Sequence, residues 1–517
     1  MSTLDIYDYV IVGAGSAGIP LAARLSSDPA VRVALIEAGP DYPTPAGTPA
    51  DLLDGNQMSL VEHDWRFTAD MLPDRRTRYF QGKVAGGASS VGNTIAIRGV
   101  PDDFDSWAAA GHTEWSWDKV LPHYLALEND LDFGGEYHGK DGPVPIRRWR
   151  PEELTTAQRV FYDGCLAAGF PQVDDHNHPT STGVGPAPSN RWDTHGRVST
   201  ATAYLAEARS RENLTILAGT AVSRVLLDDG VVRGVEVLTG ATTRELRARR
   251  VVLAAGAVCT PAILLRSGIG PREDLRRLGI DVRLDRPGVG AGLGDQARTG
   301  VFMVPKPGAE NFGASVGQIV LRTAGTGSGR ENDMYYAMVN HFDLSVQFPH
   351  LREAAGADRV FCVLVVAREP SSRGRVTLDS PDPRVAPHIN LNFLTTEYDH
   401  RLFADGLRVG WELAQTPAIR DLAERVVILD DKVLDSPDTV RDYVTSTVDS
   451  AYNPIGTARM GTADDPLAVV DQRCAVIGVE GLFVADASVM PSMARANLNL
   501  TTIMIGERVA ELLRATR

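Results

Sequence analysis

The sequence has no dense run of basic residues. It carries 66 acidic and 52 basic side chains, and its formal net charge is −14 at pH 7. Nucleic-acid-binding domains need clustered lysine and arginine side chains to meet the phosphate backbone. We therefore expect no nucleic-acid partner.

Long apolar stretches are also missing. The longest runs, residues 251–259 and 360–367, fall far short of the ~20 residues that a membrane helix needs. The segment Met1–Asp8 is acidic and lacks the basic start and apolar stretch of a signal peptide. These features predict a cytoplasmic protein without membrane insertion.

Cysteine is scarce. The four cysteines, at positions 165, 259, 362 and 474, share no close spacing. Zinc sites and disulfide frameworks are recognised by such spacings. We predict no metal site and reduced thiols, as is usual in the cytosol.

The length of the sequence predicts two domains. Its 517 residues exceed the size at which a single hydrophobic core stops growing. An apolar strand pattern, a helical pattern and a second strand pattern come first, and β-branched runs dominate the middle. Helical patterns return at residues 398–415 and 500–514. This alternation favours two interleaved domains over two domains joined by a linker.

A glycine-rich turn lies between the first predicted strand and helix. Gly13, Gly15 and Gly18 follow the apolar run 9–12, and Glu37 ends the next strand pattern. In such a unit the first glycine permits a tight turn, the second leaves room for a pyrophosphate, and the third lets the helix approach the sheet. A carboxylate after the second strand accepts hydrogen bonds from ribose hydroxyls. The pattern predicts a dinucleotide site.

A second glycine cluster, residues 288–294, does not repeat this context. It follows Asp285-Arg-Pro and no apolar strand, so we interpret it as a loop. With one fingerprint, the sequence gives no support for a second nucleotide such as NAD.

Several long motifs then identify a family. They are Phe80–Gly99, Gly256–Pro271, Pro370–Leu378, Gly456–Gly461, Val484–Pro491 and Ala496–Thr502. In this order they resemble the motifs of the glucose–methanol–choline family of FAD-dependent oxidoreductases, over essentially the whole chain. Within the family, the sequence looks most like bacterial oxidases of aryl and furfuryl alcohols, the 5-hydroxymethylfurfural type.

The resemblance implies an α/β fold. A Rossmann-like FAD-binding domain would be interleaved with an α+β substrate domain built on an antiparallel sheet. We assign residues 1–154, 196–300 and 446–517 to the FAD-binding domain. Residues 155–195 and 301–445 are assigned to the substrate domain.

The resemblance also implies FAD contacts. The stretch from Gly86 to Thr94 should run along the isoalloxazine ring, Val222 should meet the adenine, and Asp486 should lie beside the ribityl–pyrophosphate chain. Some relatives attach the flavin through a histidine at the position of Val91, so noncovalent FAD is expected here. The implied cofactor-binding residues are Gly13, Gly15, Ser16, Gly18, Glu37, Ala38, Val84, Gly86, Gly87, Ser90, Gly92, Asn93, Thr94, Val222, Gly256, Asp486, Ala487, Asn497 and Thr501.

The catalytic pair departs from the family pattern. The family histidine sits directly before the segment that begins here at Pro454, and this chain has Asn453 in its place; the partner position holds Asn497. Alcohol oxidation moves a hydride to flavin N5 and removes the hydroxyl proton, and a base speeds this by ~10²–10⁴. Asparagine donates and accepts hydrogen bonds but does not titrate near neutral pH. The pair is predicted to position an alcohol without taking its proton.

Two interpretations of Asn453 stay open: an engineered His→Asn change in an alcohol oxidase, or a natural variant with altered chemistry. Further departures cluster near it, because Gly92 stands where the family commonly has asparagine, with Asn93 one place later, and Gln296 stands where a histidine is often found. As substitute bases, Tyr452 has too high an ordinary pKa, ~10, and His341 fits an ordinary hydrogen-bonded histidine as well. Aromatic residues that fit either a substrate pocket or core packing are Trp65, Tyr335, Tyr336, Phe342 and Phe361.

The predicted function is FAD-dependent oxidation of a primary or aromatic alcohol, or a related CH–XH group. The partners would be a small-molecule substrate and O₂ or a quinone-type electron acceptor. Two alternatives remain: a non-redox flavin enzyme of the lyase or decarboxylase type, and a catalytically silent FAD-binding protein. The sequence does not indicate an oligomeric state.

Overall fold

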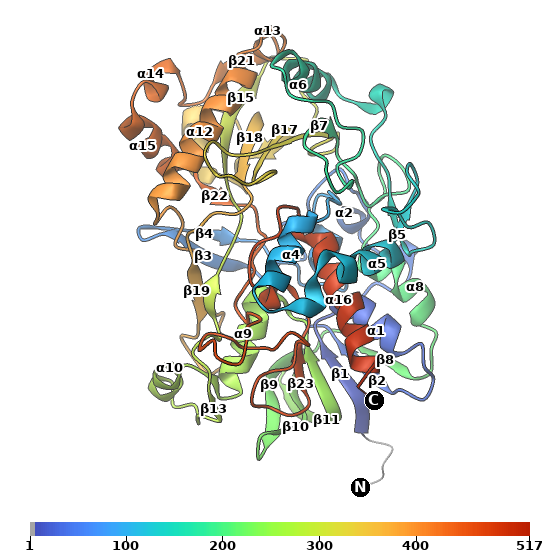
Figure 1. The fold of residues 1–517 in the computed structure, drawn as a ribbon. Coiled ribbons are helices and arrows are strands. Elements are labelled where there is room, and N and C mark those ends of the chain that lie inside the picture. Colours follow the sequence, from blue (N-terminus) through green and yellow to red (C-terminus); the bar gives the residue numbers. More distant parts are fainter. Residues whose placement is uncertain (1–5, 517) are drawn as a thin grey trace.

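The structure, a computed structural model, describes residues 6–516 (Figure 1). Residues 1–5 and 517 lie outside the described residues. Both belong to the ranges assigned to the FAD-binding domain, and residues 1–5 are also part of the acidic N-terminal segment. Three large sheets organise the described chain: one of mixed direction beside α1 and α16, one antiparallel beside α12, and a five-stranded sheet that joins them.

The first sheet has the strand order β8-β2-β1-β11-β10-β9, with β23 beside β11. Parallel pairs join β8 to β2, β2 to β1, β1 to β11 and β11 to β23. Its strands are β1 (Ile6–Val12), β2 (Val33–Ile36), β8 (Leu214–Leu217), β9 (Ala221–Asp228), β10 (Val231–Thr239), β11 (Thr242–Leu253) and β23 (Leu482–Val484). Central parallel strands are covered on both faces, which explains why β2 is buried throughout. The predicted Rossmann-like unit is confirmed.

Helices from opposite ends of the chain cover this sheet. α1 (Gly18–Leu25) packs against α16 (Leu498–Arg514), and α5 (Trp117–Leu127) packs on α16 (Figure 1). The contact with α1 is tight, because a Cβ on Gly506 would lie 2.4 Å from the carbonyl oxygen of Ala17. α9 (Gly256–Arg266) packs against β9.

The second sheet is antiparallel, as predicted, with the order β21-β15-β18-β17-β16-β7 and β22 beside β15. α12 (Glu397–Ala414) packs on β18 and β15 (Figure 1). α6 (Thr156–Ala167) and α15 (Pro437–Thr447) adjoin it. The strands are β7 (Gly183–Pro186), β15 (Ala297–Pro305), β16 (Ile319–Thr323), β17 (Met334–Asp343), β18 (Arg359–Ala367), β21 (Ala423–Val426) and β22 (Asp449–Ser450).

The two faces of this sheet have different neighbours. Successive side chains of a strand point to opposite faces. Tyr336 and Val365 therefore pack into the cluster that includes Leu402 of α12, whereas Tyr335 and Val366 belong to a cluster on the other face. The face that carries Tyr335 is the one turned toward the candidate site.

A five-stranded sheet connects the predicted domains. Its order is β14-β19-β20-β3-β4, so residues 67–79 pair with residues 374–390. The expected boundary between residues 300 and 301 falls inside β15, because that strand begins at Ala297 and belongs entirely to the second sheet. The domain division itself stays a prediction. The strands are β3 (Phe67–Leu72), β4 (Arg75–Tyr79), β14 (Ala291–Leu293), β19 (Gly374–Thr377) and β20 (His388–Asn390).

The remaining elements are short. Two-stranded ribbons pair β5 (Glu128–Asp130) with β6 (Val144–Ile146) and β12 (Ile269–Gly270) with β13 (Leu284–Asp285). The other helices are α2 (Ala50–Leu53), α3 (Ala88–Val91), α4 (Pro101–Ala109), α7 (Thr200–Ala203), α8 (Leu205–Ala208), α10 (Arg272–Arg277), α11 (Arg352–Ala355), α13 (Pro417–Arg420) and α14 (Asp431–Leu434). Across residues 6–516, no helix has both the length and the apolar character needed to cross a bilayer.

Candidate active site

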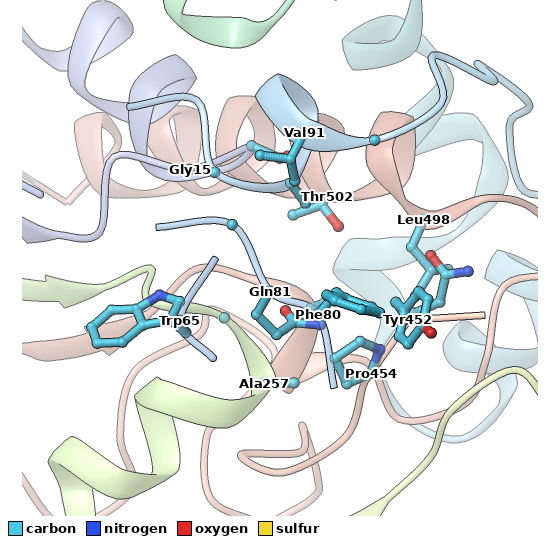
Figure 2. Close-up of a pocket in the computed structure, with 18 of the residues that line it drawn as sticks. Gly15, Trp65, Phe80, Gln81, Val91, Ala257, Tyr452, Pro454, Leu498 and Thr502 are labelled. Atoms are coloured by element: carbon cyan, nitrogen blue, oxygen red, sulfur yellow. The ribbon is translucent and has the colours of Figure 1, made fainter. Parts of the chain in front are cut away.

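A cavity of about 640 Å³ extends from the carboxyl ends of β1 and β2 to the second sheet. Val12 and Ile36 line it at one end, and Tyr335 and Val366 line it at the other. Figure 2 shows part of its wall, with Gly15 and several side chains around the open space. The volume lies within the range of roughly 300–1,000 Å³ typical of sites for cofactors and small molecules.

The glycine-rich turn forms the first end of the cavity. Gly13 has φ +99°, and a Cβ there would lie 2.5 Å from the carbonyl oxygen of Ala254. A Cβ on Gly18 would lie 1.9 Å from the carbonyl oxygen of Gly13. The turn and the close approach of α1 therefore both require glycine, for the reasons expected of a dinucleotide-binding unit.

Bare backbone from two distant segments faces this end of the cavity. Gly15 and Gly87 both line it, and a Cβ on Gly87 would lie 2.9 Å from the Cα of Gly15. Since neither residue has a side chain, a ligand can reach the main chain here, as a pyrophosphate must. The geometry fits the phosphate portion of a dinucleotide.

Glu37 lies at the same end, directly after β2, and lines the cavity. Its carboxylate accepts hydrogen bonds from the backbone N–H of Gly39 at 2.8 Å and of Ala14 at 3.1 Å. Burial raises the pKa of Glu37 to about 7, although these hydrogen bonds favour the charged form. A buried carboxylate with remaining acceptor capacity fits the ribose hydroxyls of FAD.

Glu37→Gln is expected to weaken FAD binding by about 10- to 100-fold. A hydrogen bond to a charged group contributes about 1.5–3 kcal/mol, and the amide loses that charge and one acceptor. Titration of the apoprotein with FAD, followed by flavin fluorescence, measures the effect. An unchanged dissociation constant would mean that Glu37 does not contact the ribose.

The pH dependence of apoprotein stability provides a control for that variant. A carboxyl group whose pKa is raised by folding stabilises the folded state less as the pH rises from about 4.5 through about 7. The free energy of unfolding of the wild-type apoprotein should therefore fall relative to Glu37→Gln across this window. Parallel pH profiles for the two proteins would mean that folding does not raise the pKa of Glu37.

Most of the predicted cofactor-binding residues line the cavity. They are Gly13, Gly15, Ser16, Glu37, Ala38, Gly87, Gly92, Asn93, Thr94, Val222, Gly256, Asp486, Ala487 and Asn497. The second glycine cluster, at residues 288–294, does not line the cavity.

Five predicted residues lie behind the wall instead: Gly18, Val84, Gly86, Ser90 and Thr501. The Ser90 hydroxyl donates to the carbonyl of Ala85 at 2.8 Å, and the Thr501 hydroxyl is hydrogen-bonded to that of Tyr124 at 2.8 Å. Thr502 lines the cavity in place of Thr501, because it shares a helix face with Leu498, four residues earlier.

At the other end of the cavity, hydrogen bonds fix the side chain of Asn453. Its Nδ2 donates to Oε1 of Gln296 at 3.0 Å and to the carbonyl of Ala451 at 3.1 Å. The amide oxygen, Oδ1, is therefore the atom left to accept a hydrogen bond from a ligand. Asn453 lines the cavity and is half-buried.

The side-chain amide of Asn497 is oriented the other way. Its Oδ1 accepts a hydrogen bond from Nη2 of Arg368 at 2.9 Å, which leaves the Nδ2 hydrogens for a ligand. Asn453 and Asn497 thus contribute one acceptor and one donor to the same cavity. A hydroxyl group, which both donates and accepts, matches this pair.

Arg368 connects the two amides. Its Nη1 donates to Oε1 of Gln296 at 2.6 Å, and its guanidinium carbon lies 4.0 Å from the ring centroid of Tyr335. Sequence reasoning missed this residue. The available signal was its position as the first charged side chain after the apolar run 360–367, two residues beyond the inward-facing Val366.

The loop that carries Asn453 is held by Asp295. This carboxylate accepts hydrogen bonds from the backbone N–H of Asn453 at 2.8 Å, from the hydroxyl of Tyr79 at 2.7 Å and from that of Ser450 at 2.6 Å. Burial raises the pKa of Asp295 to about 6 in spite of these hydrogen bonds. The neighbouring Tyr452 has a left-handed backbone, with φ +59°. Several distant segments therefore hold the Asn453 side chain in place.

Neither candidate substitute base is suited to that role. Burial, together with the nearby Asp449, raises the pKa of Tyr452 well above its ordinary value. His341 does not line the cavity; its Nε2 lies 3.1 Å from the carbonyl oxygen of Ala314, and burial lowers its pKa. No histidine within residues 6–516 lines the cavity.

The aromatic candidates within the second sheet divide according to its two faces. Tyr335 and Phe342 line the cavity, whereas Tyr336 and Phe361 pack in the cluster on the α12 side. Trp65 lies outside this sheet; it lines the cavity and also packs against the α12-side cluster. The interpretation as core packing therefore applies to Tyr336 and Phe361.

A separate cluster of Glu128, Asp130 and His138 has the donor types of a metal site. Arg98 forms an ion pair with Glu128, and Arg148 forms one with Asp130. Burial alone would lower the pKa of His138, but hydrogen bonds to the surrounding carboxylates outweigh it and raise the pKa to about 10. The cations already balance the carboxylates, so the cluster is an internal ion network.

Comparison with known proteins assigns the family. A family model described as GMC oxidoreductase matches residues 7–298, and its C-terminal counterpart matches residues 370–506. The chain belongs to the GMC oxidoreductase family. It is accordingly an FAD-dependent oxidoreductase that acts on CH–OH donors, as the sequence motifs predict.

Individual relatives align over nearly the full length of this GMC oxidoreductase. The 5-(hydroxymethyl)furfural oxidase of Methylovorus sp. (strain MP688) is 35% identical, with 98% of this chain and 99% of the relative covered. The oxygen-dependent choline dehydrogenase of Pectobacterium atrosepticum is 34% identical, with 98% and 94% covered. The crystal structure of pyridoxine 4-oxidase from Mesorbium loti superposes with a TM-score of 0.89 at 30% identity, covering 98% of this chain and 99% of that one.

Proposed function

We propose that this enzyme oxidises a primary or aromatic alcohol, with Asn453 and Asn497 holding the hydroxyl group. The observation that carries the proposal is the complementary amide pair at the end of a cavity whose other end is built for a dinucleotide. The similarity to an oxidase of hydroxymethylfurfural supports an alcohol as substrate.

The residues present fit FAD. Gly15, Gly87 and Glu37 would hold the pyrophosphate and ribose portions, for the reasons given above. Bound FAD would supply the hydride acceptor, its N5 atom. Val91 lines the cavity and has no nucleophilic atom with which to form a covalent link, so we propose noncovalent binding.

The chain's own contribution is orientation. Oδ1 of Asn453 accepts the hydrogen bond of the substrate hydroxyl, and Nδ2 of Asn497 donates one to its oxygen. Holding the carbinol carbon in a reactive position contributes to the rate without any proton transfer. Because an amide does not take up the hydroxyl proton, that proton passes to solvent, and we expect slow turnover of simple alcohols compared with an enzyme that has a histidine base.

Acid denaturation of the purified protein is expected to release all of its FAD into the supernatant. The reason is the absence of a linking side chain at Val91. Absorbance of the supernatant and of the redissolved precipitate measures the distribution. Yellow colour that remains with the precipitated protein would contradict noncovalent binding.

An anaerobic substrate panel tests the function itself. Primary aromatic and aliphatic alcohols should bleach the flavin absorbance in the absence of oxygen. Product formation without bleaching would support the non-redox alternative, which is consistent with a cavity wall that has no histidine within residues 6–516. No response to any compound would support a catalytically silent FAD-binding protein.

The reoxidation half of the same experiment addresses the electron acceptor. After reduction, O₂ or a quinone is mixed with the enzyme and the return of flavin absorbance is followed. We propose one of these acceptors, and a cytoplasmic location, as parts of the same function.

A further inference from the structure

We propose that Arg368 binds an anionic group of the substrate, so that the enzyme selects alcohols that carry a carboxylate. This inference rests on the proposed alcohol oxidation and specifies its substrate class. It follows from the charge of the cavity wall, from the surroundings of Arg368 and from the shape of the guanidinium group.

The substrate end of the cavity has an unbalanced positive charge. Among the lining residues, the carboxylates are Glu37 and Asp486, both at the nucleotide end. Two arginines, Arg298 and Arg368, line the substrate end. The charge of Arg298 is matched by Asp449, whose Oδ2 lies 3.0 Å from its Nη2.

Arg368 has no such partner. Only 2% of its surface is exposed, and its side-chain hydrogen bonds among the described residues go to the neutral amide oxygens of Gln296 and Asn497. Its Nε is buried without a hydrogen-bond partner among the described residues. An isolated buried charge is strongly unfavourable. The binding of an anionic group that neutralises it therefore offsets a large part of that free-energy cost.

The guanidinium stays charged at neutral pH. Burial lowers its pKa to about 10, and the nearby phenol of Tyr335 opposes this effect. A planar cation with several remaining N–H donors matches a carboxylate better than it matches a neutral hydroxyl. In the same cavity, the side chains of Ala337, Val339 and Val366 give an apolar surface for the body of an aromatic or aliphatic acid.

Two substrates that differ only in charge test the proposal. We would measure anaerobic flavin reduction by 4-(hydroxymethyl)benzoate and by 4-(hydroxymethyl)benzamide in the FAD-loaded enzyme. The wild type should reduce its flavin at least ~10-fold more efficiently with the carboxylate, since charge-assisted hydrogen bonds are the stronger ones. Arg368→Gln should bring the ratio of the two efficiencies close to one, and Arg368→Lys, which retains the charge, should preserve most of it.

A binding measurement separates this inference from the proposed function. Benzoate should perturb the flavin absorbance of the wild type and bind Arg368→Gln at least ~10-fold more weakly. If no alcohol reduces the flavin but benzoate binding depends on Arg368, alcohol oxidation fails and the anion site stands. If alcohols reduce the flavin but the wild type prefers the benzamide or treats both equally, the anion site is wrong.

One further outcome would overturn the proposal. Arg368→Gln removes hydrogen bonds that Arg368 donates to Gln296 and Asn497. A loss of activity by the same factor for both substrates, with the ratio unchanged, would make Arg368 a positioning residue for the two amides. Thermal unfolding of each variant with FAD bound establishes that the comparison is made on folded protein.

Discussion

Asn453→His is expected to raise the rate of flavin reduction by an alcohol about 10²-fold. A base within hydrogen-bond reach of the reacting hydroxyl contributes factors of ~10²–10⁴. One imidazole nitrogen would take over the hydrogen bond to Oε1 of Gln296, which Nδ2 of Asn453 now makes at 3.0 Å, and the other would face the substrate. The cationic Arg368, bonded to the same Gln296, favours the neutral imidazole that a base requires.

Asn453→Gln is the matched control, because it changes the length of the side chain and adds no titratable group. It should show no gain. Stopped-flow measurement of anaerobic flavin reduction separates this step from reoxidation. If Asn453→His leaves alcohol reduction unchanged, or abolishes a native activity, the interpretation as a disabled alcohol oxidase is wrong. The asparagine pair would then belong to a natural variant with its own chemistry.

Two glycine substitutions are expected to separate cofactor binding from folding. Gly15→Ala should reduce FAD affinity by about 10-fold or more while leaving the stability of the apoprotein unchanged. A Cβ on Gly15 would meet no protein atom closer than the Cα of Gly87, at 3.9 Å, so the protein itself has room for it. Gly15 lines the cavity, however, and the added methyl group would stand between the main chain and the cofactor. Gly18→Ala should impair both properties, because its Cβ would lie 1.9 Å from a backbone oxygen and overpacking costs about 1–3 kcal/mol.

Urea unfolding of the two apoproteins and titration with FAD provide the measurements. The comparison is informative because the two residues belong to the same turn and receive the same methyl group. Equal losses of stability in both variants would mean that Gly15 is also needed for folding. Equal FAD affinity of Gly15→Ala and the wild type would place the pyrophosphate elsewhere.

Local patterns in the sequence indicated which residues gather at the nucleotide end of the cavity. Gly13, Gly18 and Glu37 lie within one short βαβ unit, so their roles follow from spacing along a single stretch of chain. The antiparallel second sheet and the family were likewise accessible from ordered motifs. These features depend on neighbours in sequence or on long motifs that occur together.

The substrate end was less predictable because it is assembled from distant segments. Whether Asn453 offers its oxygen or its nitrogen depends on Gln296, and the orientation of Asn497 depends on Arg368. Spacing along the chain does not encode these contacts. The alternation of strand side chains was available, however, and it excludes Tyr335 and Tyr336 from facing the same side of β17.

The pairing of the first and last helices has a consequence for biosynthesis. The hydroxyl of Ser16, in the turn before α1, donates to Oδ1 of Asn499 in α16 at 2.8 Å, and β23, at residues 482–484, adds to the first sheet beside β11. Domains generally fold as units while the ribosome elongates the chain from its N-terminus. Here the glycine-rich turn is made early, but the cavity that it lines also needs residues near position 500. We therefore expect FAD to bind only after β23 and α16 have docked, because Asn497, Leu498 and Thr502 complete the cavity wall.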